Sequence, residues 1–225
     1  MPRTSKNHSA HWAAALCLFG VVHCASGSAA GASLAIHLET RDGRPLTGAV
    51  VTVDSETSHL PAPAPQSVIV DQIDLSFVPD IVVIPVGSNI SFPNTDAVSH
   101  QVYSFSNARR FQLPLYRGKP YPPVTFDQPG LVTLGCNIHD NMLAYVVVTA
   151  APFFGRTDKK GEMLVPTLPA GTYRLKLWHP LLGESAASLE RVVQVVGADR
   201  TVVSVKLAHA LRPAPITSRP HSWDY

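Results

Sequence analysis

One short segment of the chain carries three side chains that can bind a metal ion. It reads Gly135-Cys136-Asn137-Ile138-His139-Asp140-Asn141-Met142, which gives the spacing Cys-x-x-His-x-x-Met. A thiolate, an imidazole and a thioether therefore lie close together in the sequence. Strand-like runs flank the segment, at residues 131–134 before it and 143–148 after it. Because a loop between two strands can hold its ligands rigidly, the segment predicts a metal site.

This combination of donors favours copper. A thiolate with two imidazoles and a weak axial thioether is the donor set of a blue-copper site, which transfers single electrons. The segment supplies only one imidazole, so a second histidine must come from elsewhere in the chain. Zinc is the chemical rival, but structural zinc prefers more thiolates or a stronger fourth donor than methionine. Taken singly, Cys136 could be a small buried apolar residue, His139 an ordinary loop residue and Met142 part of the core.

The N-terminus predicts a secretion signal. Arg3 and Lys6 precede an apolar run at residues 12–22, and small residues follow at positions 28–30. The apolar run is too short to span a membrane as a helix. We therefore expect residues 1–30 to be removed and the mature chain to be periplasmic or secreted, without a transmembrane anchor.

Cleavage at this point changes the cysteine count. Cys17 and Cys24 would leave with the signal, so Cys136 would be the single remaining thiol in an oxidising compartment. An exposed thiol there is prone to oxidation. Ligation of a metal ion would explain why this thiol persists.

Charge and motifs exclude several classes of function. Removal of the signal lowers Lys+Arg from 18 to 16, which matches the 16 Asp+Glu residues, so the mature chain has no basic surplus. A nucleic-acid partner is therefore not expected. The sequence contains no Gly-x-Ser-x-Gly elbow, paired-carboxylate pattern or phosphate-binding loop, and so we do not expect an enzyme.

Short strands separated by turns run through the rest of the chain. Strand patterns at residues 34–39 and 49–53 predict a hairpin over residues 33–54. Prolines then predict an extended linker at residues 55–66, and residues 105–123 have no clean period and predict an irregular connection. We find no long amphipathic helix. The predicted fold class is all-β, with a sandwich architecture.

Residues 67–149 resemble the cupredoxin family of small blue-copper proteins. The matching stretches are Phe77-Val78-Pro79-Asp80, Val86-Gly87-Ser88-Asn89-Ile90-Ser91-Phe92-Pro93-Asn94-Thr95-Asp96, Ser99-His100 and Cys136-Asn137-Ile138-His139-Asp140-Asn141-Met142. The resemblance implies a Greek-key β-sandwich with one mononuclear copper ion. By the same resemblance, the copper ligands are His100, Cys136, His139 and Met142.

The resemblance also implies residues that surround the ligands. Many family members have Asn directly after the first histidine, where its side chain ties the two ligand loops together. This chain has Gln101 there instead, so the side-chain tie is not predicted. We expect Gln101 and Asn137 to support the ligands, and His139 to be the port for electrons because family members leave this ring edge near the surface.

The flanking segments resemble a carboxypeptidase-regulatory-like (transthyretin-like) β-sandwich. The motifs that carry this resemblance are residues 42–51, 157–161 and 168–173. It implies a second sandwich made of residues 31–60 and 151–208, into which a cupredoxin domain of residues 61–150 is inserted, with a loose C-terminal tail at 209–225. A hairpin over residues 33–54 cannot bury its apolar face alone, so we expect it to pack on strands after residue 160. The simpler alternative is a cupredoxin with unrelated β extensions.

These patterns together predict a type 1 copper protein that carries single electrons between redox partners, such as cytochromes or a periplasmic dehydrogenase. Two alternatives remain open, namely a copper-binding or copper-delivery module and a structural β-sandwich adaptor. A further histidine, His179 in Trp178-His179-Pro180, could be a second metal or docking residue, although such a residue more often satisfies a turn.

Overall fold

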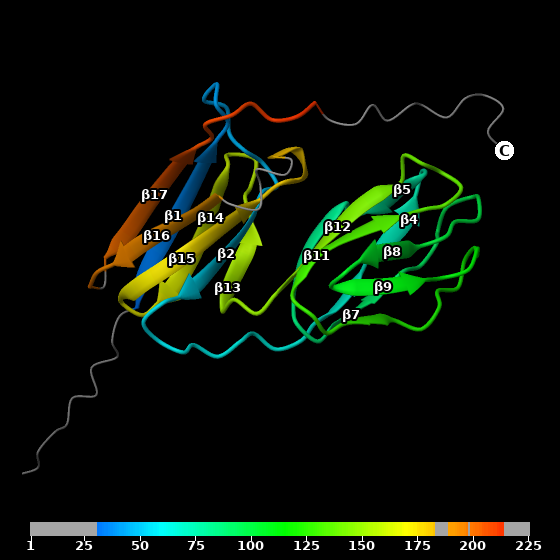
Figure 1. The fold of residues 1–225 in the computed structure, drawn as a ribbon, viewed down its shortest axis with the longest axis horizontal. Coiled ribbons are helices and arrows are strands. Elements are labelled where there is room, and N and C mark those ends of the chain that lie inside the picture. The colour runs from blue at the N-terminus through cyan, green and yellow to red at the C-terminus, as the bar shows by residue number, and fades with distance from the viewer. Residues whose placement is uncertain (1–30, 183–188, 198, 214–225) are drawn as a thin grey trace, which may run out of the picture.

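The computed structural model describes residues 31–182, 189–197 and 199–213, which form two β-sandwiches side by side (Figure 1). The expected signal at residues 1–30 and most of the expected tail, residues 214–225, lie outside this part of the chain. Within the described residues there is no α-helix, and so none that could cross a membrane. The structure confirms the all-β fold class that the sequence predicts.

The first of these units, here called the inserted sandwich, is continuous in sequence. Its strands are β3 (Ser67–Ile69), β4 (Asp71–Ile73), β5 (Ser76–Val78), β6 (Ile81–Pro85), β7 (Ser88–Ser91), β8 (Tyr103–Ser106), β9 (Arg109–Gln112), β10 (Val124–Phe126), β11 (Gly130–Gly135) and β12 (Leu143–Thr149). One sheet has the order β10-β7-β3 and the other β6-β12-β11-β8-β9, while β4 and β5 pair as a hairpin. The pairs β3–β7 and β6–β12 are parallel. Parallel neighbours cannot be joined by a tight turn, so the chain crosses between the two sheets.

Period-two alternation explains how the two sheets of the inserted sandwich pack. On β11 the buried positions are Val132 and Leu134, and on β12 they begin with Ala144 and Val146. These side chains share one hydrophobic core with Phe126 of the facing sheet. The structure therefore buries one face of each strand against the opposite sheet.

The second unit, here called the split sandwich, is built from both ends of the described chain. Its strands are β1 (Ala32–Glu39), β2 (Val50–Ser55), β13 (Phe153–Arg156), β14 (Glu162–Leu168), β15 (Gly171–Trp178), β16 (Leu189–Val195) and β17 (Arg200–Lys206). The sheet orders are β14-β1-β17 and β13-β2-β15-β16. β1 and β2 therefore pair with strands that follow the inserted sandwich, as the sequence argument on buried surface predicts.

Two local predictions are wrong. Residues 33–54 do not form a hairpin, because β1 and β2 lie in different sheets and face each other across the core of the split sandwich. This arrangement buries the apolar face of both strands, which a hairpin would leave in water. Residues 105–123 are not wholly irregular, since β9 pairs with β8. The adjacent charges of Arg109 and Arg110 obscure the alternation that places Phe111 against the core.

Thr157 joins the two sequence segments of the split sandwich. Its hydroxyl donates to the carbonyl of Leu46 at 2.6 Å and accepts the N–H of Ala49 at 3.0 Å. Its backbone N–H donates to the carbonyl of Ala49, and its carbonyl accepts the N–H of Gly48, both at 2.9 Å. The side chain is 4% exposed, so these groups satisfy one another away from water.

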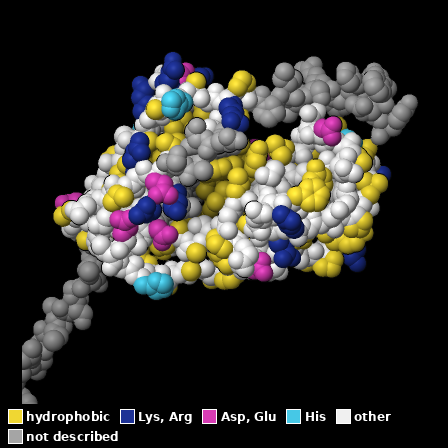
Figure 2. Space-filling view, viewed as in Figure 1, with side chains coloured by type: hydrophobic (Ala, Val, Ile, Leu, Met, Phe, Trp, Pro, Cys, Tyr) yellow, Lys and Arg dark blue, Asp and Glu magenta, His cyan; other side chains and the backbone are white. Residues whose placement is uncertain are grey.

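The two sandwiches contact each other through Arg156 and through an aromatic pair. The guanidinium of Arg156 donates to the carbonyl of Ile81, the first residue of β6, at 2.8 Å. Tyr145 of the inserted sandwich and Trp178 of the split sandwich have ring centroids 5.1 Å apart in an edge-on arrangement. Figure 2 shows hydrophobic side chains gathered where the two sandwiches meet.

We predict that Thr157→Val destabilises the split sandwich. The substitution keeps the side-chain volume but leaves the buried N–H of Ala49 without an acceptor, which costs about 1–3 kcal/mol. Urea unfolding followed by tryptophan fluorescence, to which Trp178 of this sandwich contributes, measures the change. Thr167→Val, on the exposed side of β14, is the matched control and is expected to change stability by less than about 0.5 kcal/mol. Equal effects of the two substitutions would contradict the role of Thr157.

Candidate metal centre

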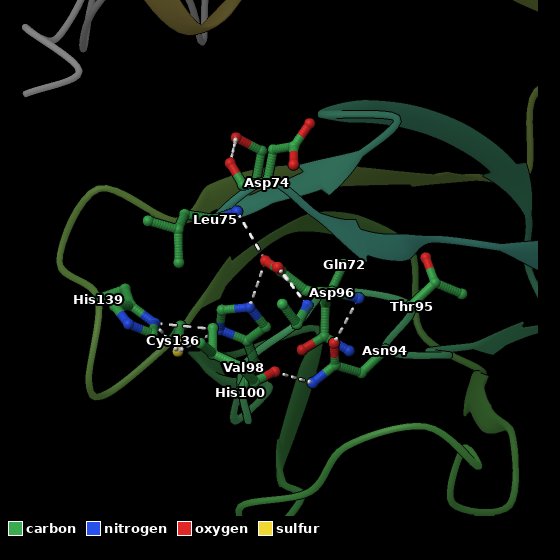
Figure 3. Close-up of polar contacts among 12 residues, drawn as sticks. Gln72, Asp74, Leu75, Asn94, Thr95, Asp96, Val98, His100, Cys136 and His139 are labelled. Carbon is green, nitrogen blue, oxygen red and sulfur yellow. Dashed lines mark hydrogen bonds and ion pairs between the residues drawn. The ribbon is translucent and has the colours of Figure 1, made fainter. Parts of the chain in front are cut away.

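Three of the predicted ligands converge at one end of the inserted sandwich (Figure 3). The Sγ atom of Cys136 lies 4.0 Å from Nδ1 of His100 and 3.9 Å from Nδ1 of His139. The two Nδ1 atoms are 3.0 Å apart. One ligand atom from each of the three residues thus lies within 4.8 Å of the others. Among the described residues, this is the cluster of three or more His, Cys, Asp or Glu side chains that could hold a metal ion.

Cys136 and Met142 stand at the two ends of the loop between β11 and β12. Gly135 pairs with Leu143 in the antiparallel register, so Cys136 and Met142 are the next residues beyond that pair. Each continues the inward alternation of its strand, and their side chains are 3% and 2% exposed. Both belong to the hydrophobic core of the inserted sandwich. The loop is closed by the N–H of Met142, which donates to the carbonyl of His139 at 3.0 Å.

His100 comes from a different loop and is held there by its backbone. It follows the loop after β7 and exchanges two backbone hydrogen bonds with Tyr116, each 3.0 Å long. The side-chain amide of Asn94 donates to the carbonyls of Val98 at 3.0 Å and Tyr116 at 2.8 Å. The side chain of His100 is wholly buried. The long loops before and after it are therefore tied together around the histidine.

Tyr116 also supports this region through its side chain. Its hydroxyl donates to the carbonyl of Phe92 at 2.5 Å and accepts from the amide of Gln72 at 2.7 Å. Burial raises the pKa of Tyr116 to about 12, so the phenol is protonated and neutral at ordinary pH.

Asp96 contacts one of the predicted ligands, although the sequence analysis gave it no role. Its Oδ2 lies 2.8 Å from Nε2 of His100 and 2.8 Å from the backbone N of Leu75. Burial opposes ionisation of the Asp96 carboxyl, but hydrogen bonds from Leu75, His100 and Ala97 outweigh it and hold its pKa below the usual value. The spacing Asp-x-x-x-His in one loop was visible in the sequence, but the contact depends on how that loop folds.

The remaining predicted residues differ in exposure. The ring of His139 is half-buried, whereas His100 is buried. Gln101 is 9% exposed directly after His100, and Asn137 is exposed. The structure therefore places Gln101 inside the sandwich beside a ligand and leaves Asn137 at the surface.

His179 lies apart from this centre, after β15 of the split sandwich. Its Nδ1 accepts the N–H of Leu181 at 3.2 Å, and its carbonyl accepts the N–H of Leu182 at 3.0 Å. Burial, followed by the charge of Arg156, lowers the pKa of His179, which favours the neutral imidazole. These contacts agree with the interpretation that His179 forms hydrogen bonds within a turn.

The donor atoms of Cys136, His100 and His139 fit a single metal ion. Metal–nitrogen and metal–sulfur bonds of about 2.0 and 2.3 Å are typical for imidazole and thiolate ligands. The separations of 3.0, 3.9 and 4.0 Å are all shorter than the sum of the two corresponding bonds, so one ion can reach all three atoms. Burial of the thiol and of His100 would keep water away from such an ion.

No model of a known protein family matches the chain, and no curated protein matches it. Among solved structures, the chain is similar to a purple cupredoxin from Nitrosopumilus maritimus, with 21% identity, a TM-score of 0.33 and coverage of 38% of this chain and 100% of that one. It is also similar to a copper-containing nitrite reductase from Thermus scotoductus (24% identity, TM-score 0.35), covering 50% of this chain and 28% of that one. A reduced mutant of amicyanin matches at 19% identity and a TM-score of 0.35, covering 44% of this chain and 99% of that one. Sequence identities and TM-scores this low do not assign a function, so a functional assignment has to rest on the geometry of the site.

We predict that Cys136→Ser removes the colour of the Cu(II)-loaded protein without unfolding it. Charge transfer from a thiolate to Cu(II) gives an intense visible band, and a serine hydroxyl cannot supply it. The fold is expected to persist, because Cys136 has no disulfide partner within the described residues and the substitution removes little volume. Visible absorption and far-UV circular dichroism of both proteins measure the two effects. A colourless wild type, or a serine variant that remains intensely coloured, would refute ligation by Cys136.

Proposed function

We propose that the protein is a type 1 (blue) copper protein of the cupredoxin kind that carries single electrons between redox partners. The observation that supports this most strongly is the convergence of Cys136, His100 and His139 within 4.8 Å. With Met142 buried in the same core as Cys136, the chain offers a thiolate, two imidazoles and a thioether, which is the donor set of such sites. Bound copper would supply one-electron exchange between Cu(I) and Cu(II).

The protein's own contribution is to hold these ligands still. Cys136 and Met142 continue two paired strands, and the backbone of His100 is hydrogen-bonded to Tyr116. Sites built on strands hold their side chains more accurately than sites on free loops. Ligands that move little when the charge of the ion changes favour fast electron transfer, so a packed β-sandwich suits this role.

His139 is the residue that we assign to electron entry and exit. It is the half-buried imidazole of the pair, whereas His100 and Cys136 are closed off from solvent. Ile138, next to it in the chain, and Leu143, the first residue of β12 after the same loop, are 51% and 38% exposed, so this loop carries exposed apolar side chains. Such a surface loses water easily when a partner docks. A redox protein that approaches here would come close to the ring of His139.

The remaining assignments follow from the same proposal. We place the mature protein in the periplasm or outside the cell, on the basis of the sequence pattern of residues 1–30. We assign residues 61–150 to a copper domain, and residues 31–60 with 151–208 to a supporting domain of the carboxypeptidase-regulatory-like kind. Redox proteins are the proposed partners, and no substrate is turned over.

Metal analysis, a visible spectrum and redox titration of the purified protein test this function. We expect one copper ion per chain, an intense visible band in the oxidised state and a reversible midpoint potential. Protein that binds no metal would indicate a structural adaptor, and protein isolated with zinc would indicate the rival metal. Copper bound without reversible reduction or electron exchange with a cytochrome would favour a delivery module. Each of these three results would overturn the proposal.

We predict that Met142→Gln keeps copper but lowers the midpoint potential. An amide oxygen is a harder donor than a thioether and stabilises Cu(II) more than Cu(I). A tenfold gain in the relative affinity for Cu(II) corresponds to about 59 mV for a one-electron couple, and we expect a decrease of at least this order. Redox titration measures it. Met142→Leu is the control, because it removes the thioether without adding an oxygen and should not lower the potential. Loss of copper from the Gln variant, or a raised potential, would contradict axial ligation by Met142.

A further inference from the structure

His100 has two ring nitrogens with different surroundings. Its Nδ1 faces Cys136 and His139, while its Nε2 lies 2.8 Å from Oδ2 of Asp96. The side chain of His100 is 0% exposed and that of Asp96 is 10% exposed. A carboxylate that is mostly shielded from solvent is therefore paired with the far side of the buried imidazole, as Figure 3 shows.

The position of Asp96 is fixed by further hydrogen bonds. Its Oδ2 also accepts the backbone N–H of Leu75 at 2.8 Å, and its Oδ1 accepts the N–H of Ala97 at 2.6 Å. Its own N–H donates to the side-chain oxygen of Asn94 at 3.1 Å. The carboxylate is thus held by its own loop and by the turn between β4 and β5.

That turn adopts a conformation that needs a reason. Asp74 and Leu75 have φ values of 49° and 57°, in the left-handed region that favours glycine. A residue such as leucine persists there only when its surroundings enforce the conformation. In this structure the conformation points the N–H of Leu75 at Asp96. Here the two-residue turn of the β4–β5 hairpin, in which Ile73 pairs with Ser76, favours positive φ at both central residues, and this turn presents the N–H of Leu75 to the carboxylate.

We propose that Asp96 is a positioning residue that orients His100 for the metal and lowers the midpoint potential of the bound copper. This inference rests on the proposed function. A carboxylate on the outer nitrogen of a ligating histidine keeps the proton on that nitrogen, leaves the lone pair of the other nitrogen for the metal, and makes the ring a stronger donor. With Nδ1 toward the site, Asp96 accepts the Nε2 proton of His100.

Charge distinguishes Asp96 from a neutral acceptor. A backbone carbonyl at this place could orient the ring equally well, but it would carry no net charge. One thiolate and one carboxylate balance the charge of Cu(II), whereas Cu(I) leaves one negative charge in excess. Excess charge in a buried site is unfavourable. Asp96 should therefore favour the oxidised ion, which lowers the midpoint potential.

The test compares Asp96→Asn with Asp74→Asn in the copper-loaded full chain. Both substitutions remove one negative charge from the same region, but Asp74 is exposed, whereas the carboxylate of Asp96 lies 2.8 Å from Nε2 of His100. For Asp96→Asn we expect the affinity for Cu(II) to fall about 10–100-fold, with a smaller loss for Cu(I), and hence a higher midpoint potential. For Asp74→Asn both affinities should stay close to the wild-type values. Chelator competition and redox titration measure them.

A measurement on the wild type covers the case in which Asp96→Asn fails to fold. Nitrogen-15 NMR of the Cu(I)-loaded protein should show a proton on Nε2 of His100 that is shifted downfield and exchanges slowly with water. A metal bound through Nε2 instead, or a rapidly exchanging proton, would overturn the inference.

The outcomes separate the two claims. A wild type without copper or without a midpoint potential would defeat the proposed function itself. A functional wild type in which Asp96→Asn behaves like Asp74→Asn would defeat only the role of Asp96. Retained potential with lost folding stability in Asp96→Asn would show that Asp96 is merely structural, and would also overturn the inference.

Discussion

The strand register of β11 and β12 is the constraint on which the metal-centre geometry depends. The register that turns Val132 and Leu134 into the core also turns Cys136 inward, and the one that buries Ala144 buries Met142. A slip by one residue would move every side chain of a strand to the opposite face. The hydrophobic core therefore supplies the free energy that fixes the thiol and thioether, and a change that weakens the core loosens the site as well.

Sequence reasoning about the candidate site is most direct where its parts are close in the chain. Cys136, His139 and Met142 lie in one loop, so their spacing alone could suggest a donor set. His100 is thirty-six residues from Cys136 and was assigned from the family resemblance. The contact of Asp96 with His100 was not predicted, because it requires the turn at Leu75 to close on another loop. Composition and spacing carry no signal for such a closure.

For the fold too, the sequence predicts local strand patterns better than long-range strand pairing. Alternation correctly indicated that β1 and β2 each bury one face, but it does not specify the partner of a strand. The prediction of a hairpin assumed that sequence neighbours pair, whereas the structure pairs β1 with β14 and β17. Contacts such as those of Thr157 with Leu46 and Ala49 close this sandwich across the whole inserted unit. The resemblance of the flanking segments and the requirement to bury apolar surface both predicted that the two segments would meet.

Burial of Cys136 changes the argument for a metal. From the sequence, a single thiol in an oxidising compartment seemed to need ligation to survive, but a side chain that is 3% exposed is already shielded from oxidants. Survival of the thiol is therefore weak support. The stronger support is its surroundings, because an apolar core position needs no imidazole nitrogens, and here those of His100 and His139 both lie within 4.0 Å of the sulfur. The three donor atoms also lie close enough together for one metal ion to bind all of them.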